Sequence, residues 1–298
     1  MTALQDVLPL SPLQEGILFH SGGGHDPYIV QLDLELDGPL DEGRLRAAGQ
    51  ALLVRHPNLR AAFVTRASGQ AVQVIPAESV LPLQVYGEAG QDTYARIKAA
   101  DALRPFELTA SPCLRMTLVT VEGRHRLLFT YHHLLLDGWS NSLVVGDLLR
   151  LYDNGGDPGR LAPAPPYRNF LAWLRERRRD GGDDAALAAW RERLAGLDGP
   201  TLAGVPDAPR GARRERPERP ERSRAEMSEE TSEAVRALCR TAGVTLGVAA
   251  QAAWALVLRT LTGRSDVVFG LTVSGRDAEV AAGRRSSARH RRGVPLVG

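Results

Sequence analysis

Apolar and polar positions follow helical and extended periods in turn along the first half of the chain. The segment Ser11-Pro12-Leu13-Gln14 combines a helix-capping serine, a proline suited to the first helical position and a glutamine three residues after the serine, which predicts a helix to about residue 20. Residues 28–36 place apolar side chains on one side of an extended chain and polar ones on the other, as in a half-buried strand. The same periods predict helices over 44–55 and 94–103 and strands over 59–65, 71–75, 113–121 and 126–131.

Beyond residue 140 the pattern is mainly helical, with predicted helices over 140–152, 167–178, 184–194, 228–242 and 244–261. The last helix is unusually apolar but contains Gln251, so we expect a buried core helix rather than a membrane segment. Residues 196–226 are rich in Gly, Pro and alternating Arg and Glu, which is typical of an exposed linker between two lobes. Residues 266–274, DVVFGLTVS, are predicted to form a strand.

Composition narrows the class of protein. The chain has 298 residues, 43% hydrophobic and 24% charged, which predicts one or two folded domains and excludes disordered and collagen-like chains. Its 37 basic and 35 acidic side chains nearly balance, so we expect neither nucleic acid nor a membrane as a partner. Cys113 and Cys239 fit neither a disulfide framework nor a metal clip, and both are expected to be buried. With no secretion signal and no apolar run of about 18 residues, we expect a cytoplasmic protein.

One segment combines groups that can do chemistry. Residues 131–140, YHHLLLDGWS, place two adjacent histidines at a strand end and an Asp-Gly pair at the start of a helix. A histidine can hold or move a proton near neutral pH. Because adjacent residues on a strand point to opposite faces, we expect one of His132 and His133 to face a cavity and the other the interior. The pair alone can be structural or catalytic.

Two familiar kinds of site are not supported by this segment. A metal site needs a third ligand at a suitable spacing, so we expect no metal. The chain also has no Gly-x-Ser-x-Gly elbow, which leaves a Ser-His-Asp triad without support.

The string His132-His133-x-x-x-Asp137-Gly138 resembles the signature of the condensation-domain superfamily of nonribosomal peptide synthetases, which is related to chloramphenicol acetyltransferase. Further resemblances follow in the family's order over residues 4 to about 280. They lie at residues 10–16 with 18–21, 55–60 with Phe63, 167–170 with Trp173, and 266–270 through 274–276.

The resemblance implies an α/β fold with a chloramphenicol acetyltransferase-like, two-lobed V shape and mixed sheets flanked by helices. The expected divisions are an N-terminal lobe over 1–180, a connecting helix and exposed linker over 181–226, a partial C-terminal lobe over 227–280 and an aberrant Arg-rich tail over 281–298. Such domains join a donor acyl or peptidyl thioester to the amine of an acceptor aminoacyl thioester. Both substrates arrive on the phosphopantetheine of peptidyl carrier proteins, so the implied partners are donor and acceptor carriers and neighbouring synthetase modules, with no cofactor bound by the chain itself.

The resemblance also implies residue roles. His133 would act at the reacting centre, either as a general base on the amine or by positioning and charge stabilisation, and His132 would be structural. Asp137 would form an ion pair with Arg276, although capping of the next helix is the alternative. Gly138 would leave room for the phosphopantetheine arm, or simply form a turn. Trp139 would pack within the lobes.

Pattern is lost after Arg276, where AAGRRSSARHRRGVPLVG shows no helical or strand period. A reading-frame change near residue 280 is our hypothesis, and it would leave the second lobe incomplete. A nucleic-acid-binding tail is the other interpretation. Two further functions therefore stay open: an inactive truncated remnant, and a stand-alone acyltransferase that uses a carrier or coenzyme A.

Overall fold

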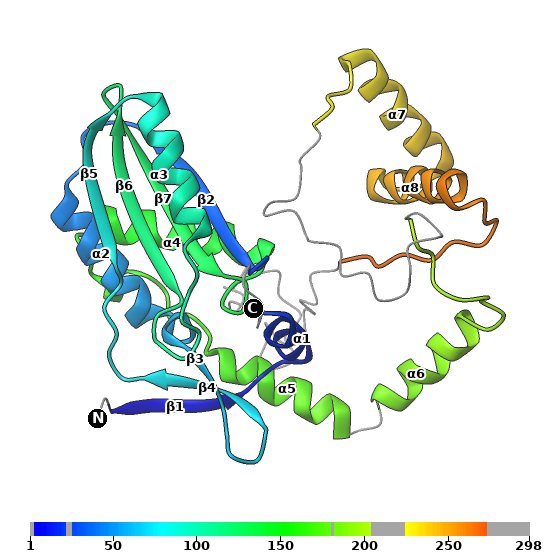
Figure 1. The fold of residues 1–298 in the computed structure, drawn as a ribbon, viewed down its shortest axis with the longest axis horizontal. Coiled ribbons are helices and arrows are strands. Elements are labelled where there is room, and N and C mark those ends of the chain that lie inside the picture. Colours follow the sequence, from blue (N-terminus) through cyan, green and yellow to red (C-terminus); the bar gives the residue numbers. More distant parts are fainter. Residues whose placement is uncertain (1–2, 22–25, 180–181, 204–223, 273–298) are drawn as a thin grey trace. The chain divides into compact units, whose positions relative to one another are not determined.

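The computed structural model describes residues 3–21, 26–179, 182–203 and 224–272 (Figure 1). These residues divide into one unit that ends at Gly182 and a second that starts at Asp183. The expected boundaries of the linker, partial lobe and tail stay predictions, and residues 273–298 lie outside the described ranges.

The first unit is built around a four-stranded mixed sheet. Its strands are β2 (Ile29–Leu36), β7 (Arg124–His132), β6 (Leu114–Val121) and β5 (Leu83–Ala89), in the order β2-β7-β6-β5. All neighbours are antiparallel except β5 and β6, which are parallel. The central strands β6 and β7 are almost wholly buried, as expected for a strand as apolar as residues 127–131.

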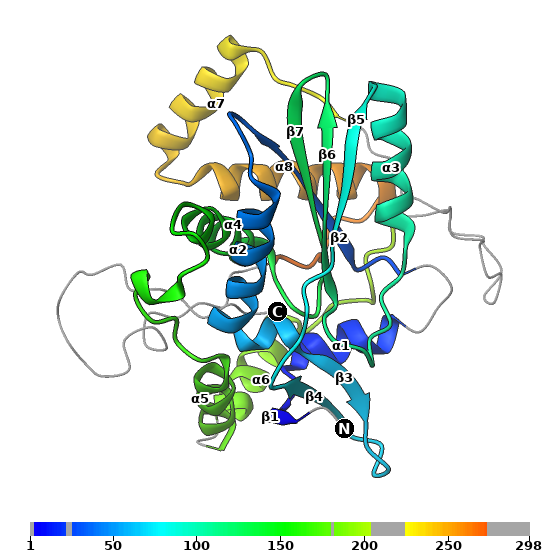
Figure 2. The same ribbon diagram turned by 90° about the vertical axis from the view of Figure 1, so that its left-hand side faces the viewer.

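Helices cover both faces of this sheet (Figure 2). Helices α2 (Glu42–Arg55) and α4 (Gly138–Asp153) pack on one face, where Leu127, Phe129 and Tyr131 join the main core. Helix α3 (Gln91–Leu103) packs on the other face, where its Tyr94 joins a smaller cluster with Leu128. Odd-numbered and even-numbered residues of β7 therefore face different layers, as the period of a strand requires.

A second, three-stranded sheet lies beside helices α1 (Pro12–His20) and α5 (Tyr167–Arg179), with the order β1 (Leu4–Pro9), β4 (Ala71–Pro76) and β3 (Ala62–Thr65). The predicted hairpin is confirmed, but its first strand starts at Ala62 rather than Leu59. Residues 57–60 form a short 3-10 helix because Pro57 fixes a helical backbone angle at its first position. Strands β1 and β5 were not predicted, since neither shows clear alternation of buried and exposed residues.

The predicted helix starts are confirmed at several caps. The Ser11 hydroxyl accepts from the backbone N–H of Gln14 at 3.3 Å, and the Gln14 side chain accepts from the backbone N–H of Ser11 at 2.9 Å. This reciprocal pair is the capping box expected from the sequence. Ser228 and Thr245 cap α7 (Glu229–Ala242) and α8 (Leu246–Thr262), where each hydroxyl accepts from a backbone N–H of the first helical turn.

A buried ion pair lies under α3. Thr130 on β7 stands opposite Gln31 on β2 and Arg115 on β6. All three donate to Asp101 of α3: Arg115 Nε at 2.8 Å, Gln31 Nε2 at 2.8 Å, and the Thr130 hydroxyl. Burial alone raises the pKa of Asp101, but the hydrogen bonds from Thr130, Arg115 and Gln31 outweigh it, so its pKa lies below the ordinary value.

The second unit contains α6 (Gly182–Arg193), α7 (Glu229–Ala242) and α8 (Leu246–Thr262). The prediction of a buried core helix over 244–261 was wrong for the described part of this unit: only Leu258 of α8 is buried, and Trp254 is 48% exposed. Residues 266–272 form no strand, because no other strand is present among the described residues of this unit to pair with them. Both cysteines are buried, as expected.

Among the described residues, no single helix is long and apolar enough to cross a membrane. Helices α7 and α8 reach the length and apolar composition of a membrane span only when taken together, and the chain bends by 103° between them.

Replacement of Asp101 by alanine should destabilise the first unit strongly. Arg115 is 4% exposed and would lose its carboxylate partner, and breaking a buried pair in this manner costs about 3–5 kcal/mol. Urea unfolding followed by circular dichroism measures this loss. The control is Glu35→Ala, which breaks the exposed pairs with Arg124 and Arg126 and should barely change stability. Equal losses in the two variants would contradict the assignment.

Candidate active site

The two histidines lie where central strand β7 ends. His132 is the last residue of β7 and pairs with Ile29 of β2. The chain then turns through Leu134, Leu135 and Leu136, which are 0–2% exposed. These leucines anchor the turn in the core and thereby fix the backbone around the histidines.

His132 is fully buried, and both of its ring nitrogens have partners. Its Nδ1 accepts from the backbone N–H of Leu134 at 3.2 Å, and its Nε2 lies 2.9 Å from the carboxylate of Asp26. Because Nδ1 is an acceptor and a carboxylate can only accept, the proton of the neutral ring lies on Nε2. Nothing in the sequence pattern had indicated Asp26, which precedes β2 in a loop.

His133 has a different environment. Its backbone N–H donates to the carbonyl of Tyr28 at 2.8 Å. The side chain is partly exposed, yet its Nδ1 is buried and has no hydrogen-bond partner within the described part of the chain. Buried polar atoms of this kind are uncommon in folded proteins, and a catalytic role is one explanation for them. The predicted interior position is therefore that of His132, and the predicted exposure of His133 to a cavity stays a prediction.

Asp137 and Gly138 start helix α4. Asp137 accepts from the backbone N–H of Ser140 at 2.7 Å and from its hydroxyl at 2.6 Å, so it is the N-cap that the sequence offered as one alternative. Arg276 lies outside the described residues, so its ion pair with Asp137 stays a prediction. A Cβ on Gly138 would meet nothing within 4 Å, and its place beside a phosphopantetheine arm also stays a prediction. Trp139 is 47% exposed rather than packed among the described residues.

The segment with Arg55, His56 and Arg60 fastens neighbouring elements. Arg55 Nε and His56 Nε2 lie 2.7 Å and 2.9 Å from Asp147 of α4, which ties α2 to α4. Burial raises the pKa of Asp147, but hydrogen bonds from His56 and Arg55 outweigh it and bring the pKa to about 2. Arg60 is 4% exposed and donates to the carbonyls of Leu53 and Pro76, so it is an inward structural arginine.

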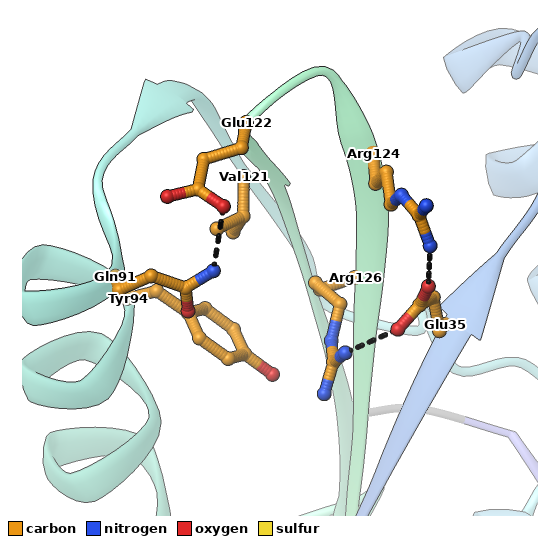
Figure 3. Close-up of a pocket in the computed structure, with 7 residues that line it drawn as sticks. All are labelled: Glu35, Gln91, Tyr94, Val121, Glu122, Arg124 and Arg126. Carbon is orange, nitrogen blue, oxygen red and sulfur yellow. Dashed lines mark hydrogen bonds and ion pairs between the residues drawn. The ribbon is translucent and has the colours of Figure 1, made fainter.

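A charged pocket of about 330 Å³ lies at the other end of the sheet (Figure 3). Arg124 and Arg126 of β7 bind Glu35 at 2.6 Å and 2.7 Å, and Tyr94 of α3 lines the opposite side. Arg124 begins β7 and His132 ends it, so at about 3.3 Å per residue the pocket lies roughly 25 Å from the histidines. It takes no part in the candidate site. No cluster of described His, Cys, Asp or Glu side chains could hold a metal ion.

Comparison with known proteins identifies the family. The sequence model of the family described as Condensation domain matches residues 4–286. The chain belongs to the condensation domain family. The family resemblance inferred from the two histidines and the flanking motifs is thereby confirmed.

Related proteins are much longer than this condensation-domain chain. Chondramide synthase cmdD of Chondromyces crocatus is 33% identical over 340 residues, which cover 97% of this chain and 8% of that protein. Tyrocidine synthase 2 of Brevibacillus parabrevis is 27% identical over 288 residues, which cover 93% of this chain and 8% of that protein.

Solved structures share the fold at lower identity. The condensation domain of the Monacolin K polyketide synthase MokA has a TM-score of 0.72 at 21% identity and covers 88% of this chain, which in turn covers 61% of that structure. The first condensation domain of the calcium-dependent antibiotic synthetase has a TM-score of 0.69 at 20% identity, with coverages of 89% and 63%. The predicted α/β, chloramphenicol acetyltransferase-like fold class is confirmed.

The two histidines should differ in their effect on stability. His132→Ala removes the ring that bonds the Asp26 carboxylate and accepts from the Leu134 N–H inside the core, so we expect a loss of about 2–4 kcal/mol. His133→Ala removes a ring whose Nδ1 has no partner in the described ranges and should change the free energy of unfolding little. Urea unfolding of both variants tests this contrast. Equal destabilisation by the two substitutions would contradict the prediction that the His132 ring, but not the His133 ring, stabilises the fold.

Acid should weaken the contact between α2 and α4. The pKa of Asp147 is 3.8 in its ordinary state and about 2 in the fold, so the unfolded chain takes up the proton first as the pH falls. The contribution, about 2 kcal/mol, is complete above pH ~4 and is lost towards pH ~2. The stability difference between wild type and Asp147→Asn should therefore shrink on acidification. A gap that stays constant between pH ~7 and ~2.5 would contradict the assignment.

Proposed function

We propose that this chain forms an amide bond between a carrier-bound donor acyl or peptidyl thioester and the amine of a carrier-bound acceptor aminoacyl thioester. Membership of the condensation domain family supports the reaction class. The observation on which the site rests is the buried Nδ1 of His133, which has no hydrogen-bond partner among the described residues and directly follows the central strand β7. We propose that the protein acts in the cytoplasm, as part of nonribosomal peptide synthesis.

The reaction needs little covalent help from the protein. The acceptor amine attacks the thioester carbonyl carbon, the C–N bond forms, the C–S bond breaks, and the amine's proton ends on the departing thiol sulfur. Reference pKa values are about 8 for an α-amine and 6.5 for imidazole, so His133 is a modest base. A thioester is already activated towards attack by an amine. Holding the amine and the carbonyl in attack geometry lowers the remaining activation barrier by several kcal/mol. His133 would accept a hydrogen bond or the proton from the amine.

The supporting residues hold the turn that follows His133. Asp137 would combine its N-cap of α4 with an ion pair to Arg276, and Gly138 would leave backbone space for the phosphopantetheine arm. Both substrates would come on the phosphopantetheine of partner carrier proteins. His132 would serve as the buried support of the turn through its bonds to Asp26 and Leu134.

His133→Ala should lower amide formation by about 100-fold or more, the range for a residue that handles a proton in a transition state. Donor and acceptor carriers are loaded with defined aminoacyl groups, and the dipeptidyl product is measured by mass spectrometry in single-turnover reactions. The matched control is His125→Ala, because His125 lies near the start of the same strand, far from the site.

Two results would contradict the proposal. Near wild-type rates for His133→Ala would remove the role of His133 at the reacting centre. Turnover of acyl-coenzyme A with a free amine or alcohol, in the absence of product from loaded carriers, would instead indicate a stand-alone acyltransferase.

A further inference from the structure

Gln14 joins four parts of the first unit through one buried amide. The side chain is 1% exposed. Its Oε1 accepts from the backbone N–H of Ser11 at 2.9 Å, from Gln73 Nε2 at 3.1 Å and from the Tyr167 hydroxyl at 3.2 Å. Its Nε2 donates to the carbonyl of Leu134 at 2.9 Å. Because the three groups around Oε1 include a backbone N–H, that atom must be the oxygen, which fixes the amide orientation.

Leu134 is the residue that follows His133, and its peptide groups are held on both sides. Its N–H donates to His132 Nδ1 at 3.2 Å, and the next N–H, of Leu135, donates to the His132 carbonyl at 2.9 Å. The His133 N–H donates to the carbonyl of Tyr28, which lies in the turn just before β2. The Leu134 carbonyl is bound by Gln14, which lies 120 residues away in sequence.

We propose that Gln14 is a positioning residue for His133: through the Leu134 carbonyl, it fixes the turn from which the His133 ring projects. This inference rests on the proposed function for its effect on the reaction, but not for its effect on the ring.

The chemistry of the amide explains why glutamine suits this position. Helix capping requires only an acceptor three residues after Ser11, which glutamate also supplies. The Leu134 carbonyl requires a donor, which glutamate lacks when ionised. Gln14 meets both requirements with one side chain that its three acceptor bonds already hold in place. An ordered supporting group of this kind keeps a reacting group within the small tolerance that catalysis needs.

The test compares Gln14→Met with Gln50→Met in the 298-residue chain. Gln50 of α2 is half-buried; its Nε2 donates to the Ser79 carbonyl at 2.7 Å and its Oε1 accepts from the backbone N–H of Leu81 at 3.3 Å. The control therefore removes an amide that also bridges two groups of the first unit, but that has no bond to Gln14 or to the histidine turn among the described residues. Two quantities are measured: the side-chain NMR resonances of ¹⁵N-labelled histidine, with those of His133 assigned by their loss in His133→Ala, and the kcat and KM of amide formation between loaded carriers.

Gln14→Met should shift the His133 ring resonances and lower kcat about 10- to 100-fold, the effect of a small misplacement near the reacting atoms, with KM changed less than about threefold. Gln50→Met should leave the His133 resonances and kcat close to wild type. Unchanged resonances and kcat in a folded Gln14→Met protein would overturn the proposal, as would equal changes in the control.

A second variant covers the case in which Gln14→Met does not fold. Gln14→Glu keeps an acceptor for Ser11, Gln73 and Tyr167 but places an oxygen against the Leu134 carbonyl, so it should show the same shift of the His133 resonances. Wild-type resonances in Gln14→Glu would overturn the proposal. If the wild-type chain yields no amide product, the proposed function fails, while the NMR comparison still decides the role of Gln14.

Discussion

The buried pair of Asp101 and Arg115 sets the geometry on which the rest of the first unit depends. Arg115 also donates to the backbone carbonyls of Asp101, at 2.5 Å, and Arg104, at 2.8 Å, and its guanidinium lies 4.2 Å from the Phe106 ring centroid. With Thr130 as a further donor, the pair ties α3 and the chain after it to the two central strands. A charge so enclosed leaves little freedom for the register of β6 against β7.

That register determines which histidine faces which layer. Thr130 and His132 are two residues apart on β7 and therefore face the same side, towards α3. His133 follows the strand and has the opposite direction. A slip of one residue would exchange the faces of the two rings and turn His133 towards the interior. The bonds of Asp101 to Arg115, Gln31 and Thr130 thus help to fix the direction of the histidine side chains. Thr130 lies only two residues before His132.

The sequence predicted the features that depend on local pattern and on motifs. The capping box at Ser11, the central strands and the opposite environments of His132 and His133 follow from spacing alone. The partners of these residues did not follow, because Asp26, Tyr28 and Gln14 meet the histidine turn only through tertiary contacts. Burial was hardest to predict: α8 is apolar enough for a core, yet burial depends on neighbours that no helical period reveals. Strands β1 and β5 were not predicted because their apolar and polar residues do not alternate clearly. They are strands because they pair with β4 and β6.

The double use of Gln14 has a consequence for how related sequences are compared. By the rules of helix capping, glutamine and glutamate at this position are equivalent, so an exchange between them counts as conservative. The Leu134 carbonyl distinguishes the two residue types, because the glutamine amide donates a hydrogen bond to it and an ionised glutamate cannot. A relative with glutamate here would keep the helix and its motif, yet would need another donor for that carbonyl. Variation at position 14 should therefore be compared together with variation around residue 134, far along the chain.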